Sequence, residues 1–75
     1  MIKLYTQPGC TRCPGVIRYL NSKVGEGNYE ILDVSTNVEA LDHLQNTLGA
    51  ASTPVVETDK GHHIGNNQKE IAALL

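Results

Sequence analysis

Two cysteines separated by two residues, Cys10 and Cys13, constrain this chain more than any other feature. The short apolar run Met1–Tyr5 precedes them, and a stretch with helical spacing follows. A cysteine pair at this spacing, between a first strand and a helix, is typical of a thiol–disulfide redox site. A disulfide between the two cysteines would close too small a loop to constrain the unfolded chain much. A labile or catalytic bridge is therefore favoured over a structural one.

The expected position of each cysteine predicts its role. Cys10 precedes the helix, where unpaired backbone N–H groups and the positive end of the helix dipole favour the thiolate. Arg12 adds a positive charge nearby. Cys13 shares the apolar face of the helix with Val16, so it is expected to be shielded from solvent. We therefore predict that Cys10 attacks a disulfide and that Cys13 resolves the product.

Other readings of the cysteine pair are a structural disulfide, two inert core thiols, or half of a zinc site. The other half of a zinc site would be His62 and His63. Neighbouring residues on a strand point to opposite faces, so these two histidines could hardly bind one metal ion. The chain has no second Cys-x-x-Cys motif. All three readings therefore have less weight than the redox site.

Length and composition predict one small domain spanning residues 1–75. A chain of this length has a modest core, which must be aliphatic here because the sequence has no Phe or Trp. A net charge of −2 without a basic run argues against a nucleic-acid binder. No segment is long and apolar enough to cross a bilayer or to serve as a signal peptide. We expect a cytoplasmic location, where a cysteine pair is more often catalytic than structural.

Hydrophobic periodicity predicts the elements of the first half of the chain. Alternation predicts a strand over residues 2–6, and Pro8-Gly9 ends it. The next helix is expected from Cys13 to about residue 24, with an apolar face of Val16, Ile17, Leu20 and Val24. A second strand is expected over residues 29–34. The helix after it is predicted from a capping box, Thr36-x-x-Glu39, to Gly49, with Val38, Leu41, Leu44 and Leu48 on one side.

The second half of the chain predicts a hairpin and a final helix. Strands are expected over residues 55–57 and 62–64, joined by a turn over residues 58–61. Asn67 is the expected N-cap of the last helix, whose buried side would be Ile71, Leu74 and Leu75. The predicted order is βαβαββα. The fold class is therefore α/β, with a four-stranded mixed sheet flanked by three helices.

Three segments at these separations resemble the glutaredoxin family of the thioredoxin fold: the cysteine loop, Thr53-Pro54 before the third strand, and His63-Ile64-Gly65 before the last helix. The resemblance covers nearly the whole chain. It implies a cis Thr53-Pro54 bond lying against the cysteines, which would turn the backbone of Thr53 toward the substrate. Thr53 would then pair with an extended substrate strand. Gly65 and Asn66 would form a turn whose N–H groups suit a carboxylate.

Two branches of this family remain open. Glutathione-using glutaredoxins usually have Cys-Pro-Tyr-Cys, where this chain has Cys10-Thr11-Arg12-Cys13, and a lysine where it has Gln7. NrdH-type redoxins, which take electrons from thioredoxin reductase and supply ribonucleotide reductase, share the Pro54-Val55-Val56 strand. They usually have Trp-Ser-Gly-Phe, where this chain has His63-Ile64-Gly65-Asn66. The resemblance favours an NrdH-like redoxin slightly, with a glutathione-dependent glutaredoxin as the alternative.

The expected function is that of a small, monomeric dithiol–disulfide oxidoreductase with no bound prosthetic group. Its partners would be a reductant, either thioredoxin reductase or glutathione, and a disulfide protein substrate. Gln7 and Arg12 are candidate contacts to these partners. Alternatives of another class are an iron–sulfur or metal carrier and a redox-silent adaptor. We expect Tyr5 to pack in the core, His43 to lie without a role on the polar side of its helix, and His62 and His63 to be solvated.

Overall fold

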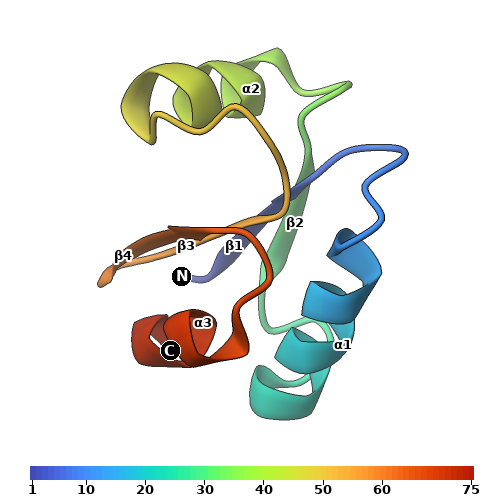
Figure 1. Ribbon diagram of the computed structural model, residues 1–75, viewed down its shortest axis with the longest axis vertical. Coiled ribbons are helices and arrows are strands. Elements are labelled where there is room, and N and C mark those ends of the chain that lie inside the picture. The colour runs from blue at the N-terminus through green and yellow to red at the C-terminus, as the bar shows by residue number, and fades with distance from the viewer.

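The fold is a four-stranded sheet with helices on both faces (Figure 1). The computed structural model describes residues 1–75. One helical segment covers one face of the sheet, and two helices cover the other (Figure 1). The elements are β1 (Lys3–Thr6), α1 (Cys13–Val24), β2 (Glu30–Asp33), α2 (Val38–Asp42), η1 (His43–Thr47), β3 (Val55–Thr58), β4 (Gly61–Ile64) and α3 (Gln68–Leu74). The expected fold class and element order are confirmed.

The sheet has the strand order β2-β1-β3-β4. β1 pairs with β2 in parallel and with β3 antiparallel, and β3 pairs with β4 antiparallel. The register sets Tyr5 between Leu32 and Val55. Because β1 and β2 are parallel and are connected through α1, this part of the chain is the βαβ unit that the sequence predicts. The cysteine loop follows the carboxyl end of the inner strand β1.

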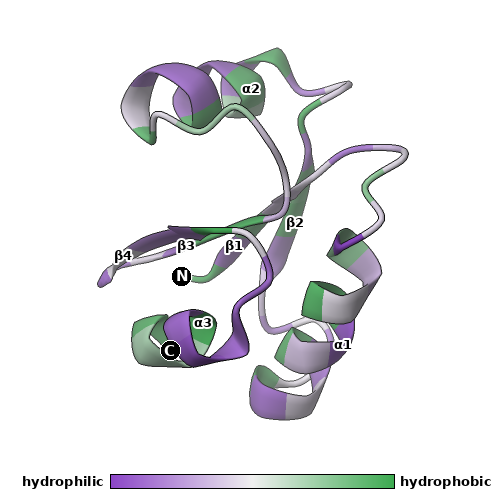
Figure 2. Ribbon diagram, viewed as in Figure 1, coloured by the Kyte–Doolittle hydropathy of each residue, from purple (hydrophilic) through white to green (hydrophobic).

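Two apolar clusters form the core, one on each face of the sheet. Alternation along β1 and β3 sends Leu4 and Val56 to one face and Tyr5 and Val55 to the other. The first face is covered by α1 and α3, whose buried residues there are Val16, Leu20 and Ile71. Figure 2 shows hydrophobic segments of α1 on the side turned toward the sheet. The second face is covered by α2 and η1, which contribute Ala40 and Leu44, and Val34 and Ala50 on either side of them complete the cluster.

The cap of α2 is a correction to the sequence prediction. Asn37, not Thr36, is the N-cap, and its side chain accepts a 3.0 Å hydrogen bond from the Ala40 N–H. The predicted Thr36-x-x-Glu39 capping box is therefore wrong by one residue. Thr36 instead lies in a turn stabilised by Asp33, whose carboxylate accepts hydrogen bonds from the backbone N–H and hydroxyl of Ser35. The Asp33 turn delays the helix start, because Thr36 and Asn37 both donate their N–H to the Asp33 carbonyl.

The apolar side of this helix also differs from the prediction. Val38 was expected in the core, yet it is 79 % exposed. The buried stripe is centred on Ala40 and Leu44, four residues apart, and Val38 points away from it. After Asp42 the helix widens into the π-turn η1, in which Leu48 donates its N–H to the His43 carbonyl five residues earlier. The sequence predicts one regular α-helix here, whereas the structure has the short α-helix α2 followed by the π-helical segment η1.

The remaining predicted features of the chain's second half fit the structure. Gly61 has φ +138°, a value that favours glycine at the end of the β3–β4 turn. Asn67 is the N-cap of α3, and its side chain accepts hydrogen bonds from the N–H groups of Lys69 and Glu70. Ile71 is fully buried, and Leu74 packs half-buried against the same cluster. None of the helices combines the length and the apolar character that a membrane span requires.

Candidate active site

The two cysteines form a disulfide at the start of α1. Their Cα atoms lie 5.5 Å apart. Cys10 is half-buried in the loop before the helix, and its N–H donates to the Gln7 carbonyl at 3.3 Å. Cys13 is the first helical residue and only 3 % exposed. The two cysteine residues therefore differ in exposure, in the direction that the sequence predicts.

The first turn of α1 leaves its amides without a side-chain partner. Arg12 is the N-cap residue and makes no capping hydrogen bond. Pro14, in the first turn, has no N–H to satisfy. The first turn also contains no acidic side chain. The positive end of this twelve-residue helix is consequently open toward the disulfide, which favours a thiolate there after reduction.

The Thr53-Pro54 peptide bond is cis, as the family resemblance implies. Pro54 is fully buried, and its carbonyl accepts a 2.8 Å hydrogen bond from the Gly65 N–H. The antiparallel register pairs Tyr5 with Val55. One step further, this register sets Pro54 opposite Thr6, at the point where the chain enters the cysteine loop. Thr53 is 7 % exposed, and its hydroxyl is buried without a hydrogen-bond partner.

The other predicted contact residues lie on the surface. Gln7, Arg12 and Asn66 are exposed, and Arg12 is in neither of the ion pairs of the structure. Gly65 has φ +111° and is half-buried beside Pro54. The structure thus brings together Cys10 with Cys13, and Pro54 with Gly65. The predicted contacts of Gln7, Arg12 and Asn66 to partners stay predictions.

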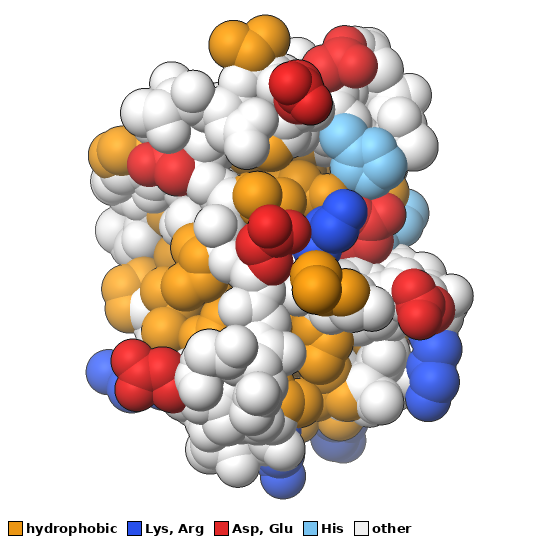
Figure 3. All heavy atoms as spheres, turned by 180° about the vertical axis from the view of Figure 1, so that it is seen from behind, with side chains coloured by type: hydrophobic (Ala, Val, Ile, Leu, Met, Phe, Trp, Pro, Cys, Tyr) orange, Lys and Arg blue, Asp and Glu red, His pale blue; other side chains and the backbone are white.

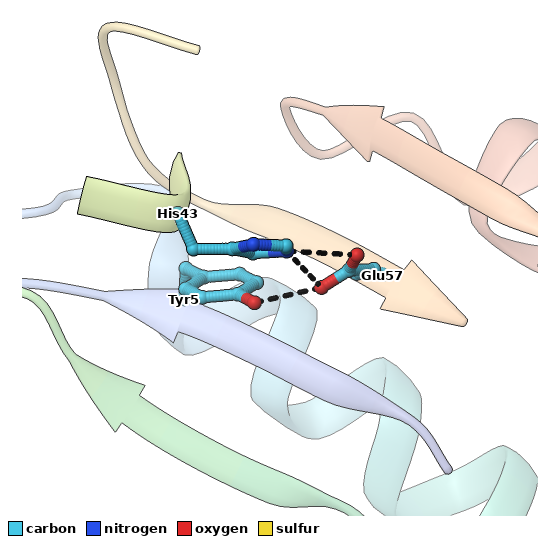
Figure 4. A network of polar contacts seen from close by, with 3 residues as sticks. All are labelled: Tyr5, His43 and Glu57. Atoms are coloured by element: carbon cyan, nitrogen blue, oxygen red, sulfur yellow. Dashed lines mark hydrogen bonds and ion pairs between the residues drawn. The ribbon is translucent and has the colours of Figure 1, made fainter. Parts of the chain in front are cut away.

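Tyr5, His43 and Glu57 form a polar cluster that was not predicted from the sequence (Figure 4). The Tyr5 hydroxyl donates to Glu57 Oε1 at 2.7 Å, and His43 Nε2 lies 3.1 and 3.0 Å from the two carboxylate oxygens. The His43 ring stacks on the Tyr5 ring, with centroids 6.1 Å apart. The predicted placement of His43 on the polar side of its helix is therefore wrong, because its side chain packs on Tyr5 and contacts Glu57, whereas its lack of a functional role stays a prediction. The expected packing of Tyr5 is confirmed, because Tyr5 is 1 % exposed.

The cluster shifts the acidity of two of its members in opposite directions. Burial raises the pKa of Tyr5, and the Glu57 carboxylate beside it raises that pKa further. For Glu57, burial would raise the pKa, but the hydrogen bonds from Tyr5 and His43 outweigh it and lower the pKa overall. Figure 3 shows a histidine side chain among acidic and basic side chains on this side of the molecule. His43 lines a surface hollow together with Lys3, Glu30 and Glu39.

No cluster of three or more His, Cys, Asp or Glu side chains in the structure is arranged to hold a metal ion. His62 is exposed on β4, whereas His63 is half-buried with its Nε2 atom inaccessible and unpartnered. The expectation that His63 is a solvated strand residue is therefore wrong. Its register opposite Val56 turns it toward the face of the sheet that α1 and α3 cover, which explains the burial.

Comparison with known proteins decides the family. The Glutaredoxin family model matches residues 2–64, from β1 to the end of β4. The chain belongs to the glutaredoxin family. Two curated relatives of this glutaredoxin-family chain are the gene 56 proteins of Mycobacterium phages D29 and L5, which are 40 % and 38 % identical to it over 58 residues. Those residues are 77 % of this chain, and they span 62 % and 54 % of the two relatives.

Solved structures show the same fold. The thioredoxin-like protein BC3987 is 31 % identical, with a TM-score of 0.88 and full coverage of both chains. NrdH-redoxin from Escherichia coli, described as glutaredoxin-like with a thioredoxin-like activity profile, is 24 % identical, with a TM-score of 0.83. That match covers 99 % of this chain and 93 % of the other. The thioredoxin fold expected for this glutaredoxin-family chain is therefore confirmed.

Proposed function

We propose that this chain is an NrdH-like dithiol–disulfide oxidoreductase that reduces protein disulfides and is itself reduced by thioredoxin reductase. The observation that supports it most is the disulfide at the start of α1, with Cys10 accessible and Cys13 only 3 % exposed. Ribonucleotide reductase is the protein substrate to which an NrdH-like chain would supply electrons. The setting would be the reducing cytoplasm, where the dithiol form can be regenerated.

The proposed reaction is two thiol–disulfide exchanges. In the reduced protein, the Cys10 thiolate attacks one sulfur of the substrate disulfide, and the other substrate sulfur leaves as a thiolate and takes up a proton. Cys13 then loses its proton and attacks the Cys10 sulfur, which releases the second substrate thiol. The substrate gains two electrons and two protons, and Cys10 and Cys13 become the disulfide. A reductase returns the two electrons.

The form of the site supports a protein partner over glutathione. None of the surface hollows of the molecule is lined by Cys10, Cys13, Thr53 or Pro54. A tripeptide with two carboxylates is best held by placed cations or helix-end amides. Gln7 provides no charge, and Arg12 is the one cation within the cysteine motif. An extended protein strand needs no such cation, because backbone groups can bind it.

The backbone before Pro54 is suited to that strand. None of the backbone hydrogen bonds of the structure outside its helices and strands involves Ala51, Ser52 or Thr53. Backbone groups without a partner form a favourable edge for a substrate strand, since binding then satisfies them. Continued beyond the last pair, Tyr5 and Val55, the β1–β3 register would lead Thr53 toward the cysteine loop. This placement supports a substrate whose disulfide is flanked by extended chain.

A reductant-choice assay tests the proposal. The oxidised protein is offered thioredoxin reductase with NADPH, or glutathione with glutathione reductase and NADPH, with a disulfide protein as the final acceptor. We expect rapid NADPH oxidation with thioredoxin reductase and its loss in Cys10→Ser. Faster turnover with glutathione at matched concentrations, with no action of thioredoxin reductase, would assign the chain to the glutathione-dependent branch instead.

A further inference from the structure

We propose that His43 is a positioning residue for disulfide exchange. Through Glu57 it holds the segment containing Thr53 and Pro54 in the position from which that segment binds an extended protein substrate. This inference rests on the proposed function and adds a residue to it that lies on the opposite face of the sheet from α1.

The Glu57 carboxylate is hydrogen-bonded to both Tyr5 and His43. Because a carboxylate only accepts hydrogen bonds, the proton of the His43 contact is on Nε2, whether the ring is neutral or charged. The side chain of His43 is 36 % exposed and that of Glu57 is 23 % exposed, so water competes only in part for this contact. The Tyr5 ring, which is 1 % exposed, packs under the His43 ring and fixes its plane.

The contact between His43 and Glu57 closes a loop in the chain. His43 begins the π-turn η1, and Glu57 is the third residue of β3. Between them the chain leaves the helix and returns to the sheet along β3 (Figure 1), and Thr53 and Pro54 belong to this connection. A side-chain link between the two ends of such a loop limits where its middle can move.

The middle of this loop has few hydrogen bonds of its own. Leu48 and Ala50 donate to the carbonyls of His43 and Leu44, and the Pro54 carbonyl accepts from Gly65. The intervening backbone of residues 51–53 makes none, and the Thr53 hydroxyl is unpartnered. Besides the burial of Thr53 and Pro54, its position therefore depends on how firmly the two ends are joined. The link between His43 and Glu57 is the side-chain hydrogen bond that joins them directly.

The same carboxylate is bonded to the strand that enters the cysteine loop. Tyr5 on β1 donates to Glu57, and one residue later β1 ends at Thr6. The cysteine loop and the Thr53 segment are thus both attached, through their strands, to Glu57. Loss of the His43 contact should loosen the Thr53 segment and leave the cysteine pair in place, because Tyr5 and the β1–β3 pairing remain.

The effect of losing the His43 contact on the reaction depends on the size of the substrate. An extended polypeptide would use the backbone of Thr53, whereas a small disulfide needs only the Cys10 sulfur. We therefore expect His43→Leu to raise the KM for reduction of insulin about fivefold, equal to roughly 1 kcal/mol at 1.4 kcal/mol per factor of ten. The kcat for insulin and the turnover of the small disulfide DTNB should change less than about twofold.

The insulin assay uses the full chain with dithiothreitol as reductant, so that the identity of the reductase does not enter. Dithiothreitol reduces DTNB directly, so the DTNB assay instead follows a single turnover of the reduced protein after dithiothreitol has been removed. His43→Gln is the rescue variant, because its amide N–H can donate to Glu57 from a similar position. Gln45→Leu, at an exposed position of the same π-turn, is the matched control. The KM for insulin of His43→Gln and of Gln45→Leu should stay within about twofold of the wild-type value. Equal KM values for wild type and folded His43→Leu would overturn the inference, and so would an equal loss with insulin and DTNB.

Hydrogen exchange measures how firmly His43 holds the segment containing Thr53, independently of catalysis. In His43→Leu the amides of Leu48 and Ala50 should exchange faster, while the Val34 amide, bonded to Thr6 across the sheet, should keep its protection. Unchanged protection at Leu48 and Ala50 would also overturn the inference. Failure of the wild-type protein to reduce either disulfide is a different result, which refutes the proposed function itself.

Discussion

The Tyr5 hydroxyl donates a 2.7 Å hydrogen bond to Glu57 Oε1 across the pair of strands β1 and β3. The two residues are 52 positions apart in the chain. Tyr5 is 1 % exposed, so the bond is shielded from water on the tyrosine side. A hydrogen bond to an ionised group in such surroundings is stronger than one between neutral groups. It therefore contributes to stability as well as to the order of the Glu57 side chain.

Tyr5→Phe should destabilise the protein by about 1–2 kcal/mol, because it removes one donor from a partly buried carboxylate. Urea unfolding of the oxidised protein at neutral pH measures the change. Tyr19→Phe is the control, since the structure shows no hydrogen bond from the Tyr19 hydroxyl and the loss there should be under about 0.5 kcal/mol. Equal stability of Tyr5→Phe and wild type would contradict the role given to this bond.

The acid sensitivity of the fold should depend on Glu57. Its pKa is lower when folded than the ordinary value of 4.5, despite burial, because Tyr5 and His43 donate to the ionised form. Its stabilising contribution is therefore complete above the unfolded pKa and is lost as the pH falls through the lower folded pKa. Glu57→Gln should show a shallower loss of stability between about pH 6 and pH 2 than wild type.

Unfolding midpoints in urea across this pH series measure the difference in slope. Some acid sensitivity should remain in Glu57→Gln, because the hydrogen bonds from Ser35 also lower the pKa of Asp33 in the folded protein. Parallel curves for the two proteins would show that the ionised form of Glu57 is not stabilised by folding.

The start of α2 gives a comparison between neighbouring residues. Asn37→Ala should cost about 1 kcal/mol, because Ala40 loses its capping acceptor, whereas Thr36→Ala should cost under about 0.5 kcal/mol. Thermal or urea unfolding distinguishes the two. A larger loss in Thr36→Ala would restore the capping box that the sequence suggests and contradict the observed cap.

Features governed by local chemistry were predictable from the sequence. The spacing of Val16 and Leu20, the turn at Gly61 and the cap at Asn67 each depend on residues within one turn of chain, and the structure agrees with them. The start of α2 was misplaced because two adjacent residues, Thr36 and Asn37, can both cap. The hydrogen bonds from Thr36 and Asn37 to the Asp33 carbonyl decide between them, and these bonds depend on where strand β2 ends.

The polar cluster could not be predicted in the same way. Tyr5, His43 and Glu57 belong to three different elements, and no spacing along the chain connects them. Their contact follows from the sheet register, which sets Tyr5 and Glu57 on one face, and from the π-turn that places His43 above them. The two cysteines lie within four residues of chain, so their spacing alone predicts the pair. Tyr5 and Glu57 are 52 positions apart, so their contact could be recognised only from the fold.

The difference in burial between the two cysteines predicts their reactivity. Reduced Cys10 should be alkylated by iodoacetamide well before Cys13, which is 3 % exposed. Mass mapping of the modified peptides at near-neutral pH measures the order. Cys13→Ser should trap a mixed disulfide with an oxidised substrate, and Cys10→Ser should not. Equal alkylation rates would remove the assignment of Cys10 as the attacking thiol.

The residue at position 7 should control how well glutathione serves as reductant. Gln7 is exposed in the cysteine loop, three residues before Cys10, where glutathione-using relatives usually have a lysine. A charge there would attract a glutathione carboxylate, and an exposed ion pair of this kind contributes at most about 1 kcal/mol. Gln7→Lys should therefore raise the rate with glutathione about threefold to fivefold, at 1.4 kcal/mol per factor of ten.

The charge, and not the length of the side chain, should produce this gain. Gln7→Met is the matched control, because methionine has a similar length and no charge, and its rate with glutathione should equal that of wild type. The gain in Gln7→Lys should shrink as the salt concentration rises, since exposed charges are screened. The rate with thioredoxin reductase should change less than the rate with glutathione in both variants. A gain in Gln7→Met, or a gain that salt leaves unchanged, would show that position 7 acts through packing instead of charge.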